Sequence, residues 1–372
     1  MRSLRAAWCL FFLCLFPGSA QTSTNLVDQP VTERQLLCWI VAGVPAFNLQ
    51  SELQNRGMEF ALDRNWLEGL KAAGADDNLL TALQKAQPPS AGDAQRDEFA
   101  DRLLRVIKEK NAKKFRAAQL HLEELVKRNK SDTDLLLALG GFLNQQEDYE
   151  EAIPVLAKAV QLAPDCAYAH EQLSFAYYRR NMSDPSIKEA KAALALKEND
   201  PDAHKVLALG YLLKNDFRTA DREFNEALKL EPDYAVVYSD LALSASLQGH
   251  ALAVIKLYQK AASLDPTKAS YFWGVAEAYE HLNRVDEAIA AYKRAKDLAP
   301  DDMRIRQNLG AAYCNSGRSE EAVGEFQELL ALDPDWNMAR LCLYKSLRRL
   351  GRMEEAAAVK AEYDKREADG GD

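Results

Sequence analysis

One leucine returns every 34 residues through the centre of the chain. It stands at Leu162, Leu196, Leu230, Leu264, Leu298 and Leu332. In five places a proline follows two residues later, at Pro164, Pro232, Pro266, Pro300 and Pro334. A fixed period of this length is typical of arrays in which one supersecondary unit is repeated. The pattern therefore predicts a stack of similar units with an extended surface, rather than a fold built around a catalytic pocket.

Several other columns keep the same phase. We number each unit from its first residue, with units at 133–166, 167–200, 201–234, 235–268, 269–302, 303–336 and from 337 onward. Position 7 is Leu or Val in every unit, and position 27 is Ala in five successive units before Leu329. Large and small residues at fixed spacing let two helices approach closely and stack on the next pair. The columns therefore predict two packed helices per unit.

The unit at 303–336 carries the pattern of the tetratricopeptide repeat most fully, at Leu309, Gly310, Tyr313, Ala322, Phe326 and Pro334. A second unit fits it less fully, at Leu241, Tyr258, Ala261 and Pro266. Residues 133–366 resemble seven units of this family, and residues 99–132 resemble a degenerate repeat through Ala118 and Leu122. The resemblance implies an all-α fold, a right-handed α-solenoid of helix pairs. Residues 367–372 are expected to form a frayed tail.

A small helical module is predicted ahead of the repeats, at residues 31–86. Thr32 and Gln35 form a capping box before an apolar run, and Gly43-Val44-Pro45 ends that helix. Together with Arg56-Gly57 and Gly74–Asp77, this string resembles a helical module found ahead of repeat arrays in exported proteins of some soil bacteria. Residues 87–95 are interpreted as a linker.

Residues 1–20 have the features of a secretory signal peptide. Arg2 and Arg5 precede an apolar run, and small residues end it before Gln21. The run is shorter than the roughly 20 apolar residues that span a bilayer, and no other candidate span is found. A lipoprotein anchored through Cys14 is disfavoured because Leu13 occupies a position that should be small. We expect an exported protein, periplasmic or secreted.

The charge and cysteine content narrow the function classes. The formal net charge is −9, which argues against nucleic acids and anionic membrane surfaces as partners. Cys38, Cys166, Cys314 and Cys342 would remain after export, and we expect buried free thiols. The helical offset between Cys314 and Cys342, about 9 Å at 1.5 Å per residue, exceeds the roughly 7 Å Cα limit for a disulfide.

No catalytic, metal or cofactor site is predicted. His170 and His204 share position 4 of consecutive units, but no further ligands accompany them. Position 4 normally holds an aromatic packing residue in this family, as Tyr238 and Phe272 do here. Nucleophile, phosphate-loop and zinc motifs are absent from the sequence.

The first helix of each unit carries a second stripe, at positions 2, 5, 9 and 12, which share one helical face. The family resemblance implies that this first-helix stripe lines a concave groove. Its middle is apolar and aromatic, and its C-terminal end is basic. We predict partner contacts at Tyr168, Phe175, Tyr178, Lys205, Leu209, Leu212, Leu243, Trp273, Arg304, Lys345 and Arg348.

A subset of the family clamps C-terminal carboxylates through Lys at position 5 and Asn at position 9. Here Lys205 is followed by Leu209, and Asp240 stands where Asn is wanted, so we reject that clamp. We predict a non-enzymatic scaffold or adaptor of the cell envelope that holds a peptide or helix of a partner protein. The alternatives are a self-assembling structural protein, an aromatic-groove carbohydrate binder, or an enzyme using residues 31–86. Tight superhelical closure could also simply bury the aromatic residues.

Overall fold

The computed structural model describes residues 31–44 and 98–368, together with isolated residues between 49 and 83. Every element in these ranges is an α-helix, apart from an isolated bridge between Val31 and Met58. Residues 1–20, the linker 87–95 and residues 369–372 lie outside the described residues, as does most of the predicted module 31–86. The chain divides into two compact units, 1–130 and 131–372.

The N-terminal unit contains α1 (Glu33–Ala42), α5 (Glu98–Asn111) and α6 (Phe115–Arg128). Thr32 Oγ1 accepts the Gln35 N–H at 3.0 Å, and Gly43 ends α1 with a φ of 81°. The α5–α6 pair keeps the 34-residue phase of the later repeats, as its interpretation as a degenerate repeat requires. The helices pack through the hydrophobic face of α6, which includes Ala118 and Leu122.

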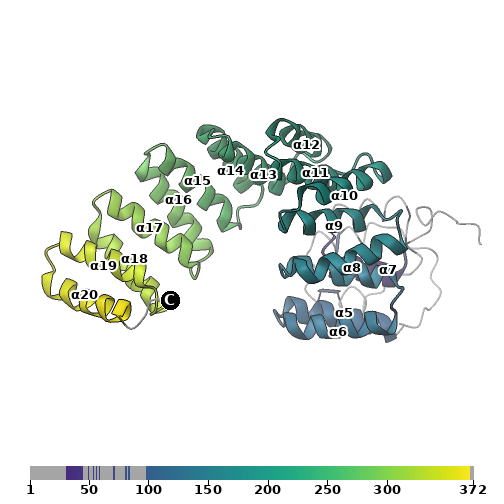
Figure 1. The fold of residues 1–372 in the computed structure, drawn as a ribbon, viewed down its shortest axis with the longest axis horizontal. Helices are drawn as coiled ribbons and strands as arrows, with labels where there is room; N and C mark the ends of the chain where they lie inside the picture. Colours follow the sequence, from purple (N-terminus) through teal and green to yellow (C-terminus); the bar gives the residue numbers. More distant parts are fainter. Residues whose placement is uncertain are drawn as a thin grey trace, which may run out of the picture. The chain divides into compact units, whose positions relative to one another are not determined.

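The larger unit contains seven helix pairs, which follow one another in sequence order (Figure 1). The first helices are α7 (Thr133–Gln145), α9 (Ala167–Arg179), α11 (Pro201–Leu213), α13 (Ala235–Leu247), α15 (Ala269–His281), α17 (Met303–Asn315) and α19 (Asn337–Arg349). The second helices are α8 (Tyr149–Leu162), α10 (Ser183–Leu196), α12 (Phe217–Leu230), α14 (Ala251–Leu264), α16 (Val285–Leu298), α18 (Ser319–Leu332) and α20 (Met353–Ala368).

These bounds repeat without slippage. Every first helix of the larger unit covers positions 1–13, and every second helix except α20 covers positions 17–30. The predicted tail at 367–372 needs a correction, because α20 continues through Glu367 and Ala368. Lys365 and Arg366 lie in its last turn, where positive charge complements the helix dipole.

The residues that are buried in every unit differ from the recurring leucine that makes the 34-residue period visible in the sequence. Position 20 is buried in every unit and position 27 in every unit before the last, and most of these residues are alanine. The recurring leucine is instead the last residue of each second helix, and Leu162 and Leu332 are 42% and 45% exposed. The small residues allow the two helices of a pair to pack closely, whereas the leucine marks a helix end.

The turn between the two helices of each pair is formed at position 15, a column that the sequence analysis did not identify. Position 15 has a positive φ throughout, at Asn181, Asn215, Asn283, Gly249, Gly317 and Gly351, and also at Lys113 and Glu147. Asn and Gly adopt this left-handed conformation most readily. The Met182 N–H then donates to the Tyr177 carbonyl at 2.9 Å across the turn. Such a bond satisfies a carbonyl that the helix end leaves open.

Each pair stacks on the next mainly through its second helix, which packs against the first helix of the following pair, as α10 does on α11 and α14 does on α15. Some successive first helices also contact each other, most extensively α9 and α11, followed by α7 with α9, α11 with α13 and α17 with α19. Among α7–α20, contacts between successive second helices are at most slight. The first helices therefore lie on the inner, tighter side of the array, which is the side that the sequence assigns to the predicted contacts.

Candidate partner-binding surface

The aromatic part of the first-helix stripe lies on α9. Phe175 and Tyr178 are half-buried, with ring centroids 6.2 Å apart. The Phe175 ring also meets Tyr149 of α8 edge-on, with centroids 6.2 Å apart. Tyr168, about two turns before Phe175 on the same helix, is half-buried and accepts a hydrogen bond from Gln172 at 3.0 Å. These three predicted contact residues are thus partly packed and partly accessible.

Two predicted contact residues on α11 are not accessible. Leu209 is 3% exposed and Leu212 is 4% exposed, and both belong to a core cluster with Phe224 and Leu241. Phe175 and Tyr178 pack against that cluster. The close approach of α9, α11 and α13 covers the two leucines, so superhelical closure removes them from the accessible surface.

Lys205 lies in the stripe but is already engaged. Its ammonium group donates to Asp202 Oδ1 and to the Tyr234 hydroxyl, which also donates to Asp202 Oδ1. Burial acts to lower the pKa of Lys205, but the charge of Asp202 and the Tyr234 hydroxyl hold it well above its usual value. Lys205 is therefore a fixed positive charge whose partners are internal.

Three carboxyl groups meet beside Lys205. An oxygen of Glu171 on α9 lies within 4.8 Å of oxygens of Asp200 and Asp202. Burial, followed by the charges of these two aspartates, raises the pKa of Glu171 well above its usual value. Glu171 is 2% exposed and makes no hydrogen bond or ion pair to any residue that the structure describes.

This cluster is a poor metal site despite its three carboxyl groups. Asp200 caps α11, where Oδ1 accepts the Asp202 N–H at 2.9 Å, and Lys197 Nζ lies 3.0 Å from Oδ2. Asp202 is held by Lys205 and Tyr234. A metal ion would have to displace both lysines, so the donor set fits ammonium groups better than a divalent cation.

Asp240 on α13 is a second carboxyl group without a partner among the described residues. It is half-buried, and burial raises its pKa to about 7, although the charge of Lys205 acts in the opposite direction. Tyr178 and Tyr258 lie within electrostatic range of it. Sequence reasoning noted Asp240 only as a departure from the carboxylate clamp, because its burial depends on the neighbouring units.

The apolar stripe continues on α13 and α15. Leu243 is 38% exposed and remains available for contact. Trp273 is half-buried and packs against the C-terminal core cluster, which includes Tyr292 and Leu309. Its indole N–H is buried and has no acceptor in the described part of the chain. Trp273 thus contributes to packing, and only part of its ring faces outward.

The basic end of the stripe is exposed. The Arg304 guanidinium lies 3.1 Å from Asp302 Oδ2, so its charge is shared with the residue that caps α17. Lys345 and Arg348 are exposed on α19, and the Arg348 guanidinium carbon lies 5.7 Å from the Tyr344 ring centroid. These side chains lie several units away from the aromatic residues of α9.

His170 and His204 are packing residues, as expected. Their Nδ1 atoms lie 2.7 Å and 2.9 Å from carboxylates of Glu189 and Glu223 on the second helix of the same unit. The His170 Nε2 lies 3.1 Å from the Pro164 carbonyl. The hydrogen bond to Glu189 raises the pKa of His170. The two histidines therefore join helices within their own units and do not form a shared metal site.

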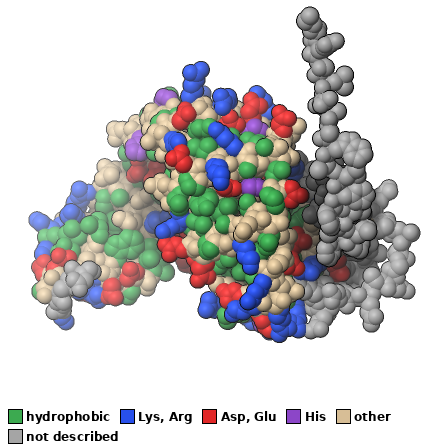
Figure 2. All heavy atoms as spheres, turned by 45° about the vertical axis from the view of Figure 1, so that its right-hand side comes forward, with side chains coloured by type: hydrophobic (Ala, Val, Ile, Leu, Met, Phe, Trp, Pro, Cys, Tyr) green, Lys and Arg blue, Asp and Glu red, His purple; other side chains and the backbone are tan. Residues whose placement is uncertain are grey.

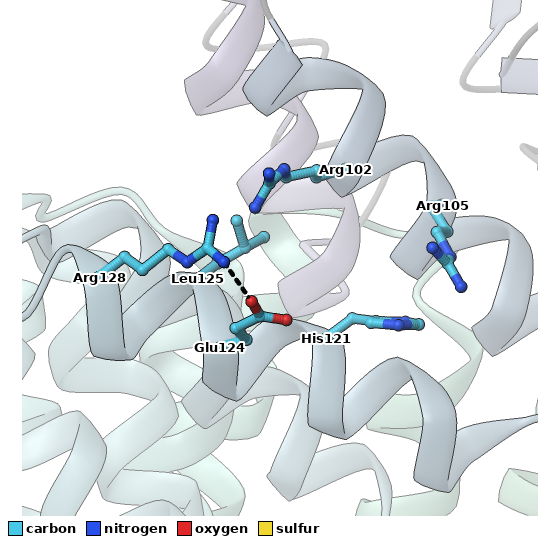
Figure 3. Close-up of a pocket in the computed structure, with 6 residues that line it drawn as sticks. All are labelled: Arg102, Arg105, His121, Glu124, Leu125 and Arg128. Atoms are coloured by element: carbon cyan, nitrogen blue, oxygen red, sulfur yellow. Dashed lines mark hydrogen bonds and ion pairs between the residues drawn. The ribbon is translucent and has the colours of Figure 1, made fainter.

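A pocket of about 280 Å³ lies in the α5–α6 pair and is lined by Arg102, Arg105, His121, Glu124, Leu125 and Arg128 (Figure 3). Arg128 is paired with Glu124 at 2.5 Å. Arg105 and His121 share Glu109, at 3.1 Å and 2.7 Å. Internal carboxylates thus balance much of its positive charge, and the sequence analysis did not identify this pocket.

The four cysteines are free, as expected, but only Cys38 is buried. Cys166, Cys314 and Cys342 are half-buried, which corrects the expectation of buried thiols. Cys314 Sγ lies 3.1 Å from Ser346 Oγ. Burial raises the pKa of Cys166 to about 11, so this thiol stays protonated and unreactive at neutral pH.

Charges of both signs are interspersed with hydrophobic side chains on the face shown in Figure 2. No broad basic area appears on that face, in keeping with the net charge of −9. Among the described helices, none has the length and apolar character that crossing a membrane requires.

Helix pairs of constant length, stacked at a 34-residue period, define the class of α-solenoid repeat proteins. Two family models described as tetratricopeptide repeat match the chain, one at residues 109–167 and 240–302, the other at residues 143–210 and 283–342. Together they cover more than half of the sequence, and the chain belongs to the tetratricopeptide repeat family. Members of this family generally mediate protein–protein interactions and are typically non-enzymatic scaffolds.

Solved structures resemble the chain at low sequence identity. A chain of the APC/C hetero-tetramer Cut9–Hcn1 is 15% identical with a TM-score of 0.51, over 83% of this chain and 68% of that chain. TTC0263, a thermophilic protein of Thermus thermophilus, is 21% identical with a TM-score of 0.46, over 49% and 100%. PilF of Pseudomonas aeruginosa is 18% identical with a TM-score of 0.46, over 56% and 94%. The comparison with curated proteins gives no match.

Proposed function

We propose that the protein is a non-enzymatic adaptor of the cell envelope that holds an extended or helical segment of a partner protein against its first-helix stripe. One observation carries the proposal. Phe175, Tyr178 and Leu243 lie on the inner side of the array and keep accessible apolar surface there. Accessible aromatic and aliphatic side chains on one continuous face are typical of protein-binding surfaces.

The structure narrows the predicted contact set. We exclude three of the predicted residues as direct contacts, because Leu209 and Leu212 are buried and Lys205 is paired internally. Tyr168, Phe175, Tyr178 and Leu243 are the proposed direct contacts. Lys345 and Arg348 are proposed to receive acidic groups of a longer partner.

Site-specific photo-crosslinking tests this proposal directly. A photoreactive amino acid replaces Leu243 on the stripe or, as a control, Leu252 on α14, which is 63% exposed. We expect adducts with a partner protein from position 243 alone, identified by mass spectrometry. Tyr178→Ala should reduce the adduct yield at a temperature well below the melting temperature of the variant, where the variant is folded. Equal adducts from both positions would contradict the proposal, and adducts with the chain itself would instead support self-assembly.

Export through residues 1–20 is part of this proposal. The support is the order of positive, apolar and small residues at the start of the sequence. Fractionation of the source cells, followed by intact-mass measurement, should find a chain that begins at Gln21 outside the cytoplasm. A cytoplasmic protein that retains residues 1–20 would overturn the proposed location and leave the binding surface unaffected.

A further inference from the structure

Two acidic side chains on the inner side of the array lack a counter-charge of their own. Glu171 on α9 and Asp240 on α13 flank α11, and neither makes a hydrogen bond or ion pair to a residue that the structure describes. Asp240 is the more accessible of the two. An uncompensated carboxylate away from bulk water costs free energy, so such groups are usually paired.

The nearby lysines do not supply the missing charge. Lys197 is paired with Asp200, and Lys205 is paired with Asp202 and the Tyr234 hydroxyl. Both lysines are therefore engaged by other acids, and Asp240 has no ammonium or guanidinium group of its own among the described residues.

Aromatic rings accompany the unpaired carboxyl groups. Tyr178 lies within electrostatic range of Asp240, and Phe175 lies beside Tyr178 with centroids 6.2 Å apart. Both rings keep accessible surface, and an aromatic face attracts a cation that is paired with a neighbouring carboxylate. The long alkyl stem of lysine or arginine would cover apolar surface while its charged end reaches the carboxylate.

We propose that the inner face of α9, α11 and α13 recognises a Lys or Arg side chain of the partner segment, with Asp240 as its acceptor. This inference rests on the proposed function. It commits to a protein partner and not to a metal ion, because the oxygens of Asp200 and Asp202 are already engaged by lysines, the N-cap bonds and Tyr234.

A displayed library of random twelve-residue peptides tests the proposal on the mature full chain. The unmodified protein should enrich peptides that combine a basic residue with aromatic or aliphatic ones. For an enriched peptide, replacing its Lys or Arg by Gln should weaken binding by about tenfold or more. Asp240→Asn should weaken the original peptide to the same extent and leave the Gln peptide unchanged, which isolates the pairwise interaction.

Two comparisons make the result decisive. Asp286→Asn removes an exposed acid on α16 and should leave peptide binding unchanged. Melting temperatures of all variants verify that each is folded. Enriched peptides that bind equally well with Gln, or equally well to Asp240→Asn, would overturn the recognition of a cation while retaining the binding surface. A library that yields no peptide sensitive to Tyr178→Ala would overturn the proposed binding of a segment itself.

Discussion

At the scale of single residues, this protein carries acidic groups whose surroundings oppose their ionisation. Burial raises the pKa of Asp240 to about 7, and burial with two neighbouring aspartates raises that of Glu171. Such groups destabilise the folded chain at neutral pH, because the unfolded chain ionises them more easily. Residues that cost stability without serving the fold are frequently functional, which agrees with the proposed role of Asp240.

The raised pKa of Asp240 determines whether the stability of the protein rises or falls with pH. Between its unfolded pKa, roughly 4, and its folded pKa of about 7, the folded state binds more protons. The free energy of unfolding therefore falls as pH rises through this window. Asp240→Asn should raise the melting temperature at pH 8, through a gain of roughly 1–3 kcal/mol in the free energy of unfolding. The same substitution should change the melting temperature little at pH 4. Calorimetry at both pH values measures this, and equal effects at both would contradict it.

Glycines in the α17–α18 pair should respond oppositely to the same substitution. A Cβ on Gly310 would lie 2.9 Å from two ring carbons of the buried Phe326, whereas a Cβ on Gly324 would meet nothing within 4 Å. Gly→Ala gains about 1 kcal/mol in a free helix position, and overpacking costs about 1–3 kcal/mol. Gly324→Ala should raise the urea midpoint, and Gly310→Ala should lower it. A gain in both variants would show that the Phe326 ring moves aside.

At the scale of elements, the side chain at position 4 joins the first helix to its surroundings in several units, in two ways. The side chains of His170, Tyr238, Arg306 and Arg340 all contact the carbonyl of a proline six residues earlier. His170, His204 and Arg306 also meet an acid nineteen residues later, on the second helix. In these units the side chain at position 4, whether His, Tyr or Arg, therefore connects the first helix to the preceding loop, to the second helix or to both.

The last pair depends on this arrangement at Arg340. Its guanidinium is buried and donates to the Pro334 carbonyl and, at 3.2 Å, to Glu362 of α20. Arg340→Ala should cost about 2 kcal/mol and loosen α20. Glutamyl endopeptidase should then cleave α20 several-fold faster. Lys360→Ala removes the pair with Asp364 and a cation–π contact with Tyr363, both within α20, and should leave the rate nearly unchanged. Acceleration of similar size in both variants would contradict the role of Arg340.

At the scale of the whole molecule, stability is expected to vary along the repeat array, because each pair is stabilised mainly by its neighbours. The α9–α11 contact is extensive, whereas α20 has a pair on one side only and buries just Ala356. Amide exchange measured by mass spectrometry should be slowest in α9–α12 and fastest in α20. Uniform protection along residues 131–368 would indicate instead that the array unfolds as one cooperative unit.

The sequence by itself determined the fold class and the phase of the repeat. These features depend on local patterns that most units carry in full: small residues at positions 20 and 27 and proline at position 32. It also indicated the helix face on which Phe175, Tyr178 and Leu243 lie. Such features need only the helical period and the repeat phase.

The tertiary structure alone decided which stripe residues remain accessible and which are paired. Leu209 and Leu212 are buried because neighbouring first helices approach closely, and Lys205 pairs with Tyr234, 29 residues away. Asp240 and Glu171 stay unpaired because Lys197 and Lys205 pair locally with Asp200 and Asp202, each three residues away. Burial depends on the contacts between units, which no single repeat encodes.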